Sequence, residues 1–486
     1  MTRPHHAKLL FGLAFAALLL AGCLPSVSPS GAQSGGPGAS VPPRPATTTT
    51  TGAPVTTTVP APTTTTAAPT PPASGGFVHP GVVLSRDDLD FVRAKIAAGE
   101  EPWKGAYDAI LGGGSSESTA ARPTRYRYSS LSYPPMPVPV IQSAGDSHTA
   151  YAAAHPELGW GNIGRDEHID DAQAAYAQAL LWYYTGNHAY ADKAIEIMDA
   201  WSSTLREIKF AEPINPVDGL PQFEGGKTQA AWGGSLFARA GEIIRYSGAG
   251  WSAADVDRFE SMLHDIYLPI TITNWTNGAN WMTTLAEATI SIGVFTDDRA
   301  AFDAGIASWR SKVPSTIYMT SDGPLPVPPS PGYDTATEFY NLWYKPSSYV
   351  AGLHQEALRD ISHMGMGLGA MSDGAQTAMI QGIDLWGEEQ VRILAGYELA
   401  AGYVNQYLDK VDGGAALPAG WKPTGWVGAT FSVGGEYYAG GWEVAYAHYA
   451  EDLGIAMPNT QRLVERVRPF GPGLHLSWQT LTNARS

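Results

Sequence analysis

The sequence predicts an all-α protein built from helical hairpins, and three observations support this fold class. Beyond residue 76, Gly and Pro divide the chain into segments of helical length. Few stretches alternate apolar and polar residues in the way that exposed strands do. The helical pairs recur about every 50 residues, which is typical of stacked or circularised αα-hairpins. Periodicity alone does not distinguish an open solenoid from a closed ring.

The first 23 residues have the features of an export signal. Arg3, His5, His6 and Lys8 precede the apolar run 9–20, which is shorter than the roughly 20 apolar residues of a spanning helix. The run leads into Leu-Ala-Gly-Cys at 20–23, which resembles a bacterial lipobox. We therefore expect residues 1–23 to be a lipoprotein signal peptide and Cys23 to become the lipidated N-terminus. The alternative is an ordinary signal peptide whose cleavage site lies near a cysteine.

Residues 24–76 consist mostly of Thr, Pro, Ala, Ser and Gly, and Arg44 is their only charged residue. Such a segment buries too little apolar surface to offset its conformational entropy, so it is expected to be a disordered linker. No later run approaches membrane-spanning length. We expect residues 77–486 to form the folded domain, held at the extracellular face of the cell membrane by the lipid.

Composition excludes several functional classes. The chain has 30 Lys and Arg against 46 Asp and Glu, a formal net charge of −16, which argues against a broad nucleic-acid-binding surface. A single cysteine permits neither an intramolecular disulfide nor a cysteine-based zinc cluster. Phosphate-loop, dinucleotide and Gly-x-Ser-x-Gly motifs are absent. His168, His354 and His363 lack the i, i+4 pairing of a helical zinc site, so we expect no metal and no cofactor.

The first clear hairpin pairs residues 171–184 with 190–205. Apolar side chains in 171–184 recur at i, i+3, i+4 spacing, and the helix is expected to stop at Thr185-Gly186-Asn187. The same rhythm predicts three further pairs: 229–246 with 254–266, 282–294 with 299–312, and 353–381 with 389–408.

Two long segments, 124–164 and 321–348, interrupt this rhythm. The first is rich in Tyr, Pro and Gly, and the second has five prolines between residues 324 and 331, followed by aromatic residues that include Tyr340 and Tyr344. Loops of this length in a compact domain are usually functional. A structural wrap around the helices is the alternative, and it is more plausible for the first segment.

The densest polar cluster lies in an otherwise apolar segment. It contains His354, Gln355, Glu356, Arg359, Asp360 and His363. At about 100° per residue, Gln355 to His363 share one helix face, and Gly367 removes bulk from that face one turn later. A carboxylate, a guanidinium and an imidazole on one face under a long loop suit an acid–base or anion site. A buried ion-pair network between hairpins is the alternative.

A second candidate cluster lies at two expected helix starts. Asn280 and Trp281 follow an Asn/Gly turn, where Asn280 is expected either to cap a helix beginning near Met282 or to point its amide at a ligand. Lys227, Gln229 and Trp232 open another hairpin and offer a cation, an amide and a sugar-stacking ring. Trp232 can equally be a core residue.

Taken in order, these residues resemble the alginate-lyase-like superfamily of helical-toroid polysaccharide lyases. The resemblance extends from about Phe77 to the C-terminus and rests on the following motifs: His79-Pro80-Gly81, Gln229-x-x-Trp232-Gly233, Asn280-Trp281, Gln355-Glu356-x-x-Arg359-Asp360-x-x-His363 and Gly441-Trp442-Glu443. In the best-known pattern the Asn is followed by His, whereas Trp281 follows Asn280 here.

The resemblance implies an (α/α) toroid or incomplete barrel of about six or seven hairpins. It also implies a lyase that cleaves a polyuronate, of the alginate, polymannuronate or glucuronan type, by β-elimination. Asn280 with Arg359 would neutralise the uronate carboxylate, and His363, Tyr340 or Tyr344 would move protons. The expected substrate contacts are Lys227, Gln229, Trp232, Trp281, His354, Gln355 and Glu356.

Two other functions stay open. A glycoside hydrolase on the same scaffold would need two carboxylic acids flanking the scissile bond, and Glu356 and Asp360 are poorly spaced for this. A non-catalytic lipoprotein that binds acidic glycans is the other alternative. The expected partners are an acidic polysaccharide and, through the lipid, the membrane, and the expected state is a monomer.

Overall fold

The computed structural model describes residues 76–112, 127–143, 157, 161–209, 226–273, 278–333, 335–434 and 440–486. All of them lie in one compact unit of the chain, Thr63–Ser486. The predicted signal peptide, Cys23 and the predicted linker up to residue 75 lie outside the described residues. Within the described ranges, no helix combines the length and the apolar character needed to cross a membrane.

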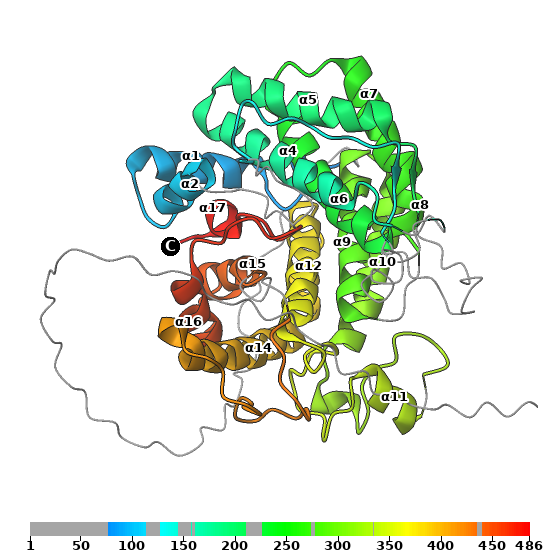
Figure 1. The fold of residues 1–486 in the computed structure, drawn as a ribbon, viewed down its shortest axis with the longest axis vertical. Helices are drawn as coiled ribbons and strands as arrows, with labels where there is room; N and C mark the ends of the chain where they lie inside the picture. Colours follow the sequence, from blue (N-terminus) through cyan, green and yellow to red (C-terminus); the bar gives the residue numbers. More distant parts are fainter. Residues whose placement is uncertain are drawn as a thin grey trace, which may run out of the picture. The chain divides into compact units, whose positions relative to one another are not determined.

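Helical pairs dominate the fold, as predicted (Figure 1). The pairs are α1 (Arg86–Ala98) with α2 (Trp103–Gly112), α4 (Arg165–Thr185) with α5 (His188–Thr204), α6 (Gly226–Tyr246) with α7 (Ala253–Met262), α9 (Ala279–Phe295) with α10 (Arg299–Thr316), α12 (Ile361–Ile380) with α14 (Gln390–Val411), and α15 (Glu443–Tyr446) with α16 (Pro458–Val467). The four hairpins predicted from periodicity are all among them. The two β-strands of the described ranges, β1 (Val140–Ile141) and β2 (Glu207–Ile208), form one short parallel pair.

The remaining short elements connect or extend these pairs. They are a π-helical turn, η2 (Leu263–Tyr267), with α8 (Leu268–Thr271) after α7; 3-10 turns η3 (Thr320–Asp322) and η4 (Asp412–Gly414); α11 (Ala336–Leu342); α13 (Leu385–Glu388); the π-helical turn η6 (Ala447–Asp452); and α17 (Gln479–Asn483).

The helices close into a ring, which periodicity alone did not predict. Successive inner helices pack side by side in the order α4, α6, α9 and α12. From α12 the contacts continue through α15 and α17 to α1, and α1 packs back on α4. The fold is therefore the (α/α) toroid that the resemblance implied.

The inner helices α6, α9 and α12 run in parallel. Ala231 near the start of α6 packs on Leu285 of α9, whereas a β-carbon on Gly241 near its end would lie 2.6 Å from Phe295 at the end of α9. Likewise a β-carbon on Gly367 in α12 would lie 3.4 Å from Asn280 Cα at the start of α9. The N-terminal ends of these helices consequently meet at one mouth of the ring.

A buried ion network joins the same three helices below this mouth. Arg239 of α6 contacts Glu287 of α9 at 2.6 Å and Asp373 of α12 at 2.8 Å, and all three side chains are at most 2% exposed. Burial raises the pKa of Glu287 to about 7. Because removing one member of such a network leaves a buried charge unpaired, the network fixes how the inner helices pack.

The first described residues are fastened to the ring through His79. Its Nδ1 lies 2.9 Å from the buried Glu242 of α6, and its Nε2 lies 3.2 Å from Asp297. Burial by itself lowers the pKa of His79, but the two carboxylates outweigh it and the pKa is raised. The ring of His79 also stacks on Tyr246, with centroids 4.3 Å apart.

Two predictions about helix starts were wrong. The predicted helix 353–381 begins only at Ile361, because Asp360 has an extended backbone (φ −169°, ψ 162°) and caps α12. Residues 355–359 form turns instead, and His354 forms an isolated β-bridge with Ile317. The helix predicted to begin near Met282 begins at Ala279 after Gly278 (φ 80°), so Asn280 is its second residue and not its N-cap.

The long loops differ in structure. In the described part of 124–164, Tyr133 is buried and donates to Asp171 of α4 at 2.8 Å, which favours the structural wrap for this segment. The segment 321–348 forms α11 in its middle, and Phe339 and Trp343 anchor it to the core.

Candidate active site

The N-terminus of α9 is capped by side chains that lie 76 residues further along the chain. Gln355 Oε1 accepts from the Ala279 N–H at 2.8 Å, and Glu356 Oε2 accepts from the Asn280 N–H at 2.6 Å. Glu356 is 0% exposed. The first N–H groups of a helix lack intrahelical partners and carry positive partial charge, so an amide oxygen and a carboxylate suit this position. These two residues hold Asn280 in place, and direct substrate contact by them stays a prediction.

Asn280 is buried at this helix start, and its side chain is not used as a cap. Its backbone carbonyl accepts from Thr284 Oγ1 at 2.6 Å, and its side-chain Oδ1 has no hydrogen-bond partner among the described residues. A buried polar atom without a partner costs about 1–3 kcal/mol. The amide is therefore available to a ligand.

His354 occupies the space that Gly367 leaves on α12. A β-carbon on Gly367 would lie 2.7 Å from His354 Nε2. The ring is 1% exposed, its Nδ1 accepts from the Glu356 N–H at 3.2 Å, and burial lowers its pKa to about 3. His354 is thus a neutral imidazole wedged between α9 and α12, and its Nε2 has no partner in the described structure.

Arg359 and Tyr344 lie over the buried Glu356. Arg359 Nη1 donates to Glu356 Oε1 at 3.0 Å, while 37% of the arginine side chain is exposed. Burial by itself lowers the pKa of Arg359, but Glu356 and Tyr344 outweigh it, so the pKa is raised and the guanidinium stays charged. Burial raises the pKa of the Tyr344 hydroxyl, and the interaction with Arg359 offsets this only in part. Tyr344 is consequently a protonated phenol beside a fixed cation.

His363, in the first turn of α12, pairs with Asp360. Its Nδ1 lies 2.7 Å from the Asp360 carboxylate, and its side chain is 24% exposed. Burial raises the pKa of Asp360, but the hydrogen bonds from His363 outweigh it and the pKa is lowered. The sequence placed both residues in the polar cluster but missed their pairing. The available signal was an Asp three positions before the His at a helix start, which is an N-cap pattern.

The other predicted site residues lie on α6, α9 and α11. Lys227 Nζ donates to Thr273 Oγ1 at 3.1 Å. Gln229 and Trp232 lie in the first two turns of α6, and the Gln229 Oε1 and Trp232 Nε1 atoms are buried without partners in the described structure. Trp281 is half-buried in the first turn of α9. Tyr340 of α11 is 46% exposed, and no described contact links it to the cluster.

Asn280, Tyr344, Glu356, Arg359 and Asp360 with His363 therefore form one connected group. Glu356 bonds both the Asn280 N–H and Arg359, Arg359 interacts with Tyr344 and with the Asp360 carboxylate, and Asp360 pairs with His363. The residues come from α9, the segment after α11, the turns before α12, and α12 itself. Within the described ranges, no group of three His, Cys, Asp or Glu residues is arranged to hold a metal ion.

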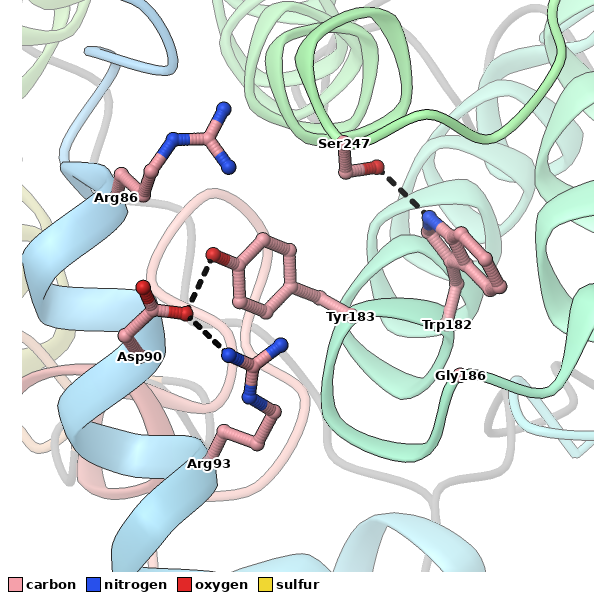
Figure 2. Close-up of a pocket in the computed structure, with 7 residues that line it drawn as sticks. All are labelled: Arg86, Asp90, Arg93, Trp182, Tyr183, Gly186 and Ser247. Atoms are coloured by element: carbon pink, nitrogen blue, oxygen red, sulfur yellow. Dashed lines mark hydrogen bonds and ion pairs between the residues drawn. The ribbon is translucent and has the colours of Figure 1, made fainter.

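A depression of about 300 Å³ lies elsewhere, between α1 and the C-terminal end of α4 (Figure 2). Its polar groups are paired: Asp90 accepts from Tyr183 and from Arg93, each at 2.8 Å, Trp182 donates to Ser247 at 2.7 Å, and Arg86 donates to Tyr246 O at 2.6 Å. The start of α4 lies at the mouth described above, since His168 contacts Gly233 of α6. The depression is thus at the other end of α4 and is separate from the candidate active site.

Comparison with known proteins agrees with this fold. Residues 161–327 match the family model described as alginate lyase. The matched region spans α4 to α10 and contains Gln229, Trp232 and Asn280, whereas Arg359 and His363 lie beyond it. No curated protein matches the sequence.

Three solved structures illustrate the similarity. An alginate lyase from Bacteroides ovatus is 12% identical, with 84% of this chain and 100% of that chain covered and a TM-score of 0.50. A variant of alginate lyase A1-III complexed with tetrasaccharide is 15% identical, with 85% and 98% covered and a TM-score of 0.50. Alginate lyase A1-III from Sphingomonas species A1 is 15% identical, with 82% and 95% covered and a TM-score of 0.47.

At these identities the likeness to solved structures concerns the fold, and the family model adds the sequence match. Together they confirm the resemblance and the fold class that were predicted. The chain is thus an (α/α)-toroid protein similar in fold to solved alginate lyases, and its residues 161–327 resemble the alginate lyase family in sequence.

Proposed function

We propose that this chain is a lipid-anchored lyase at the extracellular face of the cell membrane that cleaves a uronic-acid-containing polysaccharide by β-elimination. One observation carries the proposal. Among the buried polar atoms without partners in the described structure, four lie close to where α6, α9 and α12 begin, namely Gln229 Oε1, Trp232 Nε1, Asn280 Oδ1 and His354 Nε2, although others lie elsewhere in the core. Native proteins rarely leave such atoms unpaired away from functional sites, so this mouth favours a polar ligand.

The charges at the mouth suit an anionic sugar despite the acidic chain. Three parallel helices direct the positive ends of their dipoles toward it. Glu356 lies at the N-terminus of α9 and Asp360 at the N-terminus of α12, and these carboxylates pair with Arg359 and His363 respectively. Arg359, with over a third of its side chain exposed, is the cation best placed to engage a uronate carboxylate.

Elimination first requires that the uronate carboxylate be neutralised, because only then is the C5 proton acidic enough to remove. We assign this role to Asn280 and Arg359, which act as preplaced donors to the enolate-like intermediate. The C5 proton then passes to a base, the C4–O4 bond breaks, and O4 takes up a proton. The product carries a C4=C5 double bond.

We assign the base to His363 and the acid to Tyr344. His363 is partly exposed and held by Asp360, whereas the raised pKa of Tyr344 favours a phenol that donates its proton. Tyr344→Phe should therefore be more damaging than Tyr340→Phe. The reverse order would move the acid to Tyr340, and an intact Tyr344→Phe with an intact His363→Ala would refute the assignment.

The contacts argue against a hydrolase. Two carboxylic acids must flank the scissile bond in hydrolysis, one of them protonated. Glu356 is fully buried and accepts from Asn280 N–H and Arg359, and Asp360 is held by His363 with a lowered pKa. Neither is placed to donate a proton to a glycosidic oxygen.

The test is to purify the full-length chain in mild detergent and incubate it with polymannuronate, polyguluronate, glucuronan and hyaluronan. We expect the near-ultraviolet absorbance of an unsaturated uronate with at least one polymer. Asn280→Ala should abolish it, while the matched control Asn405→Ala, a buried Asn bonded to Asn459 on the outer helices, should retain turnover in the folded fraction. New reducing ends without absorbance would indicate hydrolysis. Retention on a polyuronate column with neither signal would indicate binding only.

A further inference from the structure

We propose that Asp360 is a positioning residue that fixes His363 with its Nδ1 protonated and its Nε2 free to take the C5 proton. This inference rests on the proposed function and deepens it. The family resemblance gave Asp360 no role, and the inference assigns it one. The inference also identifies Nε2 of His363 as the atom that acts as the base.

The Asp360 carboxylate holds His363 at two points. Its Oδ1 accepts from the backbone N–H of His363 at 2.8 Å, and the same carboxylate lies 2.7 Å from the ring Nδ1. The first contact is the N-cap of α12 and the second fixes the ring relative to that helix. Because backbone and ring of one residue are bound by one carboxylate, the imidazole has little rotational freedom.

The loop 432–434 accepts hydrogen bonds from two of the first N–H groups of α12, so the Asp360 carboxylate needs to bond only that of His363. The Ile361 N–H donates to Ser432 O at 3.1 Å, and the Ser362 N–H donates to Val433 O at 2.9 Å. Gly434, at φ 78°, lies so close that a β-carbon there would be 2.5 Å from Asp360 Oδ1. The loop 432–434 therefore satisfies the other first-turn N–H groups of α12 and closes over the carboxylate, which is 8% exposed as a residue.

The charges around Asp360 keep it ionised. His363 and Arg359 both favour the charged form of Asp360, and Tyr344 and Glu356 are further titratable groups nearby. An ionised carboxylate only accepts hydrogen bonds, so the ring nitrogen that faces it must carry a proton. The lone pair of the neutral imidazole is then on Nε2, and this atom has no partner in the described structure.

The proton and electron transfers balance on this assignment. The Nε2 lone pair forms a bond to the C5 proton, and the C5–H electron pair becomes the C4=C5 double bond as the C4–O4 bond breaks. O4 receives a proton from the Tyr344 phenol. The imidazolium, stabilised by Asp360, returns its proton to solvent or to the phenolate before the next turnover.

The test uses Asp360→Asn in the full-length chain. Asn is as good an N-cap as Asp, so the variant should keep the helix start but lose the charge that faces Nδ1. The matched control is Asp298→Asn at the N-cap of α10, where Oδ1 accepts from the Ala301 N–H at 3.0 Å and no site residue is in contact. Each variant is assayed on the polymer that the wild type cleaves best, with a thermal unfolding curve.

We expect Asp360→Asn to unfold within a few degrees of wild type and to lose about 100-fold or more in kcat with little change in KM, the scale of general acid–base catalysis. The acidic limb of its kcat/KM profile should move to lower pH, because the imidazolium loses its carboxylate partner. Asp298→Asn should keep wild-type kcat. If Asp360→Asn does not fold, Asp360→Ser, which retains a capping oxygen, replaces it.

A double-mutant comparison decides between positioning and a merely structural role. If Asp360 acts through His363, adding Asp360→Asn to His363→Ala should change kcat less than threefold. An equal loss of kcat in both backgrounds would overturn the inference, as would a single Asp360→Asn variant with wild-type kcat and an unmoved pH profile. A wild-type chain that cleaves none of the polymers refutes the proposed function itself, which distinguishes the two failures.

Discussion

Replacing Arg359 by Lys tests whether the guanidinium binds a substrate carboxylate or only braces the turns around Glu356. A planar guanidinium can engage a carboxylate through two parallel hydrogen bonds, whereas an ammonium cannot. If Arg359 binds the uronate, Arg359→Lys should lose activity even though the charge is retained. If it only braces the structure, the variant should lose stability while the folded fraction stays active.

The structure sets the size of each effect. Arg359 gives one hydrogen bond of 3.0 Å to a fully buried carboxylate, but 37% of its own side chain is exposed. Lys leaves a cation near Glu356, so we expect a stability loss of only about 1 kcal/mol. Removing one preplaced donor from the transition state lowers kcat and kcat/KM together by about 2–4 kcal/mol, or roughly 30- to 1000-fold. The loss of activity should thus exceed the loss of stability.

The assay compares initial rates of polyuronate cleavage with chemical unfolding of the same preparations. Arg310→Lys is the matched control, because Arg310 also pairs with a carboxylate, Glu388, through two hydrogen bonds of 2.7 and 2.6 Å, but at an exposed position outside the site. It should change stability by at most about 1 kcal/mol and leave turnover unchanged. Wild-type turnover in a destabilised Arg359→Lys chain would refute the assignment of Arg359.

Three further predictions follow from other contacts. Gly367→Ala should destabilise the fold by about 1–3 kcal/mol in chemical unfolding, because its β-carbon would lie 2.7 Å from the His354 ring. The control Gly402→Ala should be neutral or stabilising, because its β-carbon would meet nothing closer than 3.5 Å. Equal effects of the two substitutions would contradict the packing argument. The pKa of His79 is raised in the folded protein, so its contribution to stability is complete below the unfolded pKa of 6.5 and is lost as the pH rises through the folded pKa. From pH 6 upward the wild type should therefore lose more unfolding free energy than His79→Gln. Parallel plots of unfolding free energy against pH for the two proteins would refute this. Cys23→Ala should release the protein from the membrane fraction. Retention of this variant in the membrane fraction would refute the lipid anchor.

Local patterns predicted most of the helices because the stopping signals are local. Gly186 takes a left-handed conformation (φ 67°) at the end of α4, and Asn187 caps α5 by accepting from the Ala189 N–H at 3.2 Å. Both are short-range effects of residue type. The pairing of α4 with α5 could therefore be predicted from residues 171–205 alone.

The site was harder to predict because its contacts are long-range. Gln355 and Glu356 were placed on a helix face, but they cap the distant helix α9 instead. The helical pattern of 353–381 is interrupted at Asp360, which caps α12, and the only local signal for this was an Asp three positions before His363. The polar residues were correctly singled out as a cluster. The geometry that connects them comes from turns, whose residues follow no regular sequence spacing.

The central claim, elimination at this mouth of the ring, is tested most directly by cleaving a polyuronate in water enriched with heavy oxygen and weighing the products by mass spectrometry. Elimination adds no water, so we expect unlabelled products whose masses sum to that of the substrate, formed by the wild type and not by His363→Ala. Masses that sum to the substrate plus one water per cleavage, with the labelled oxygen in one of the two products, would show hydrolysis and contradict elimination.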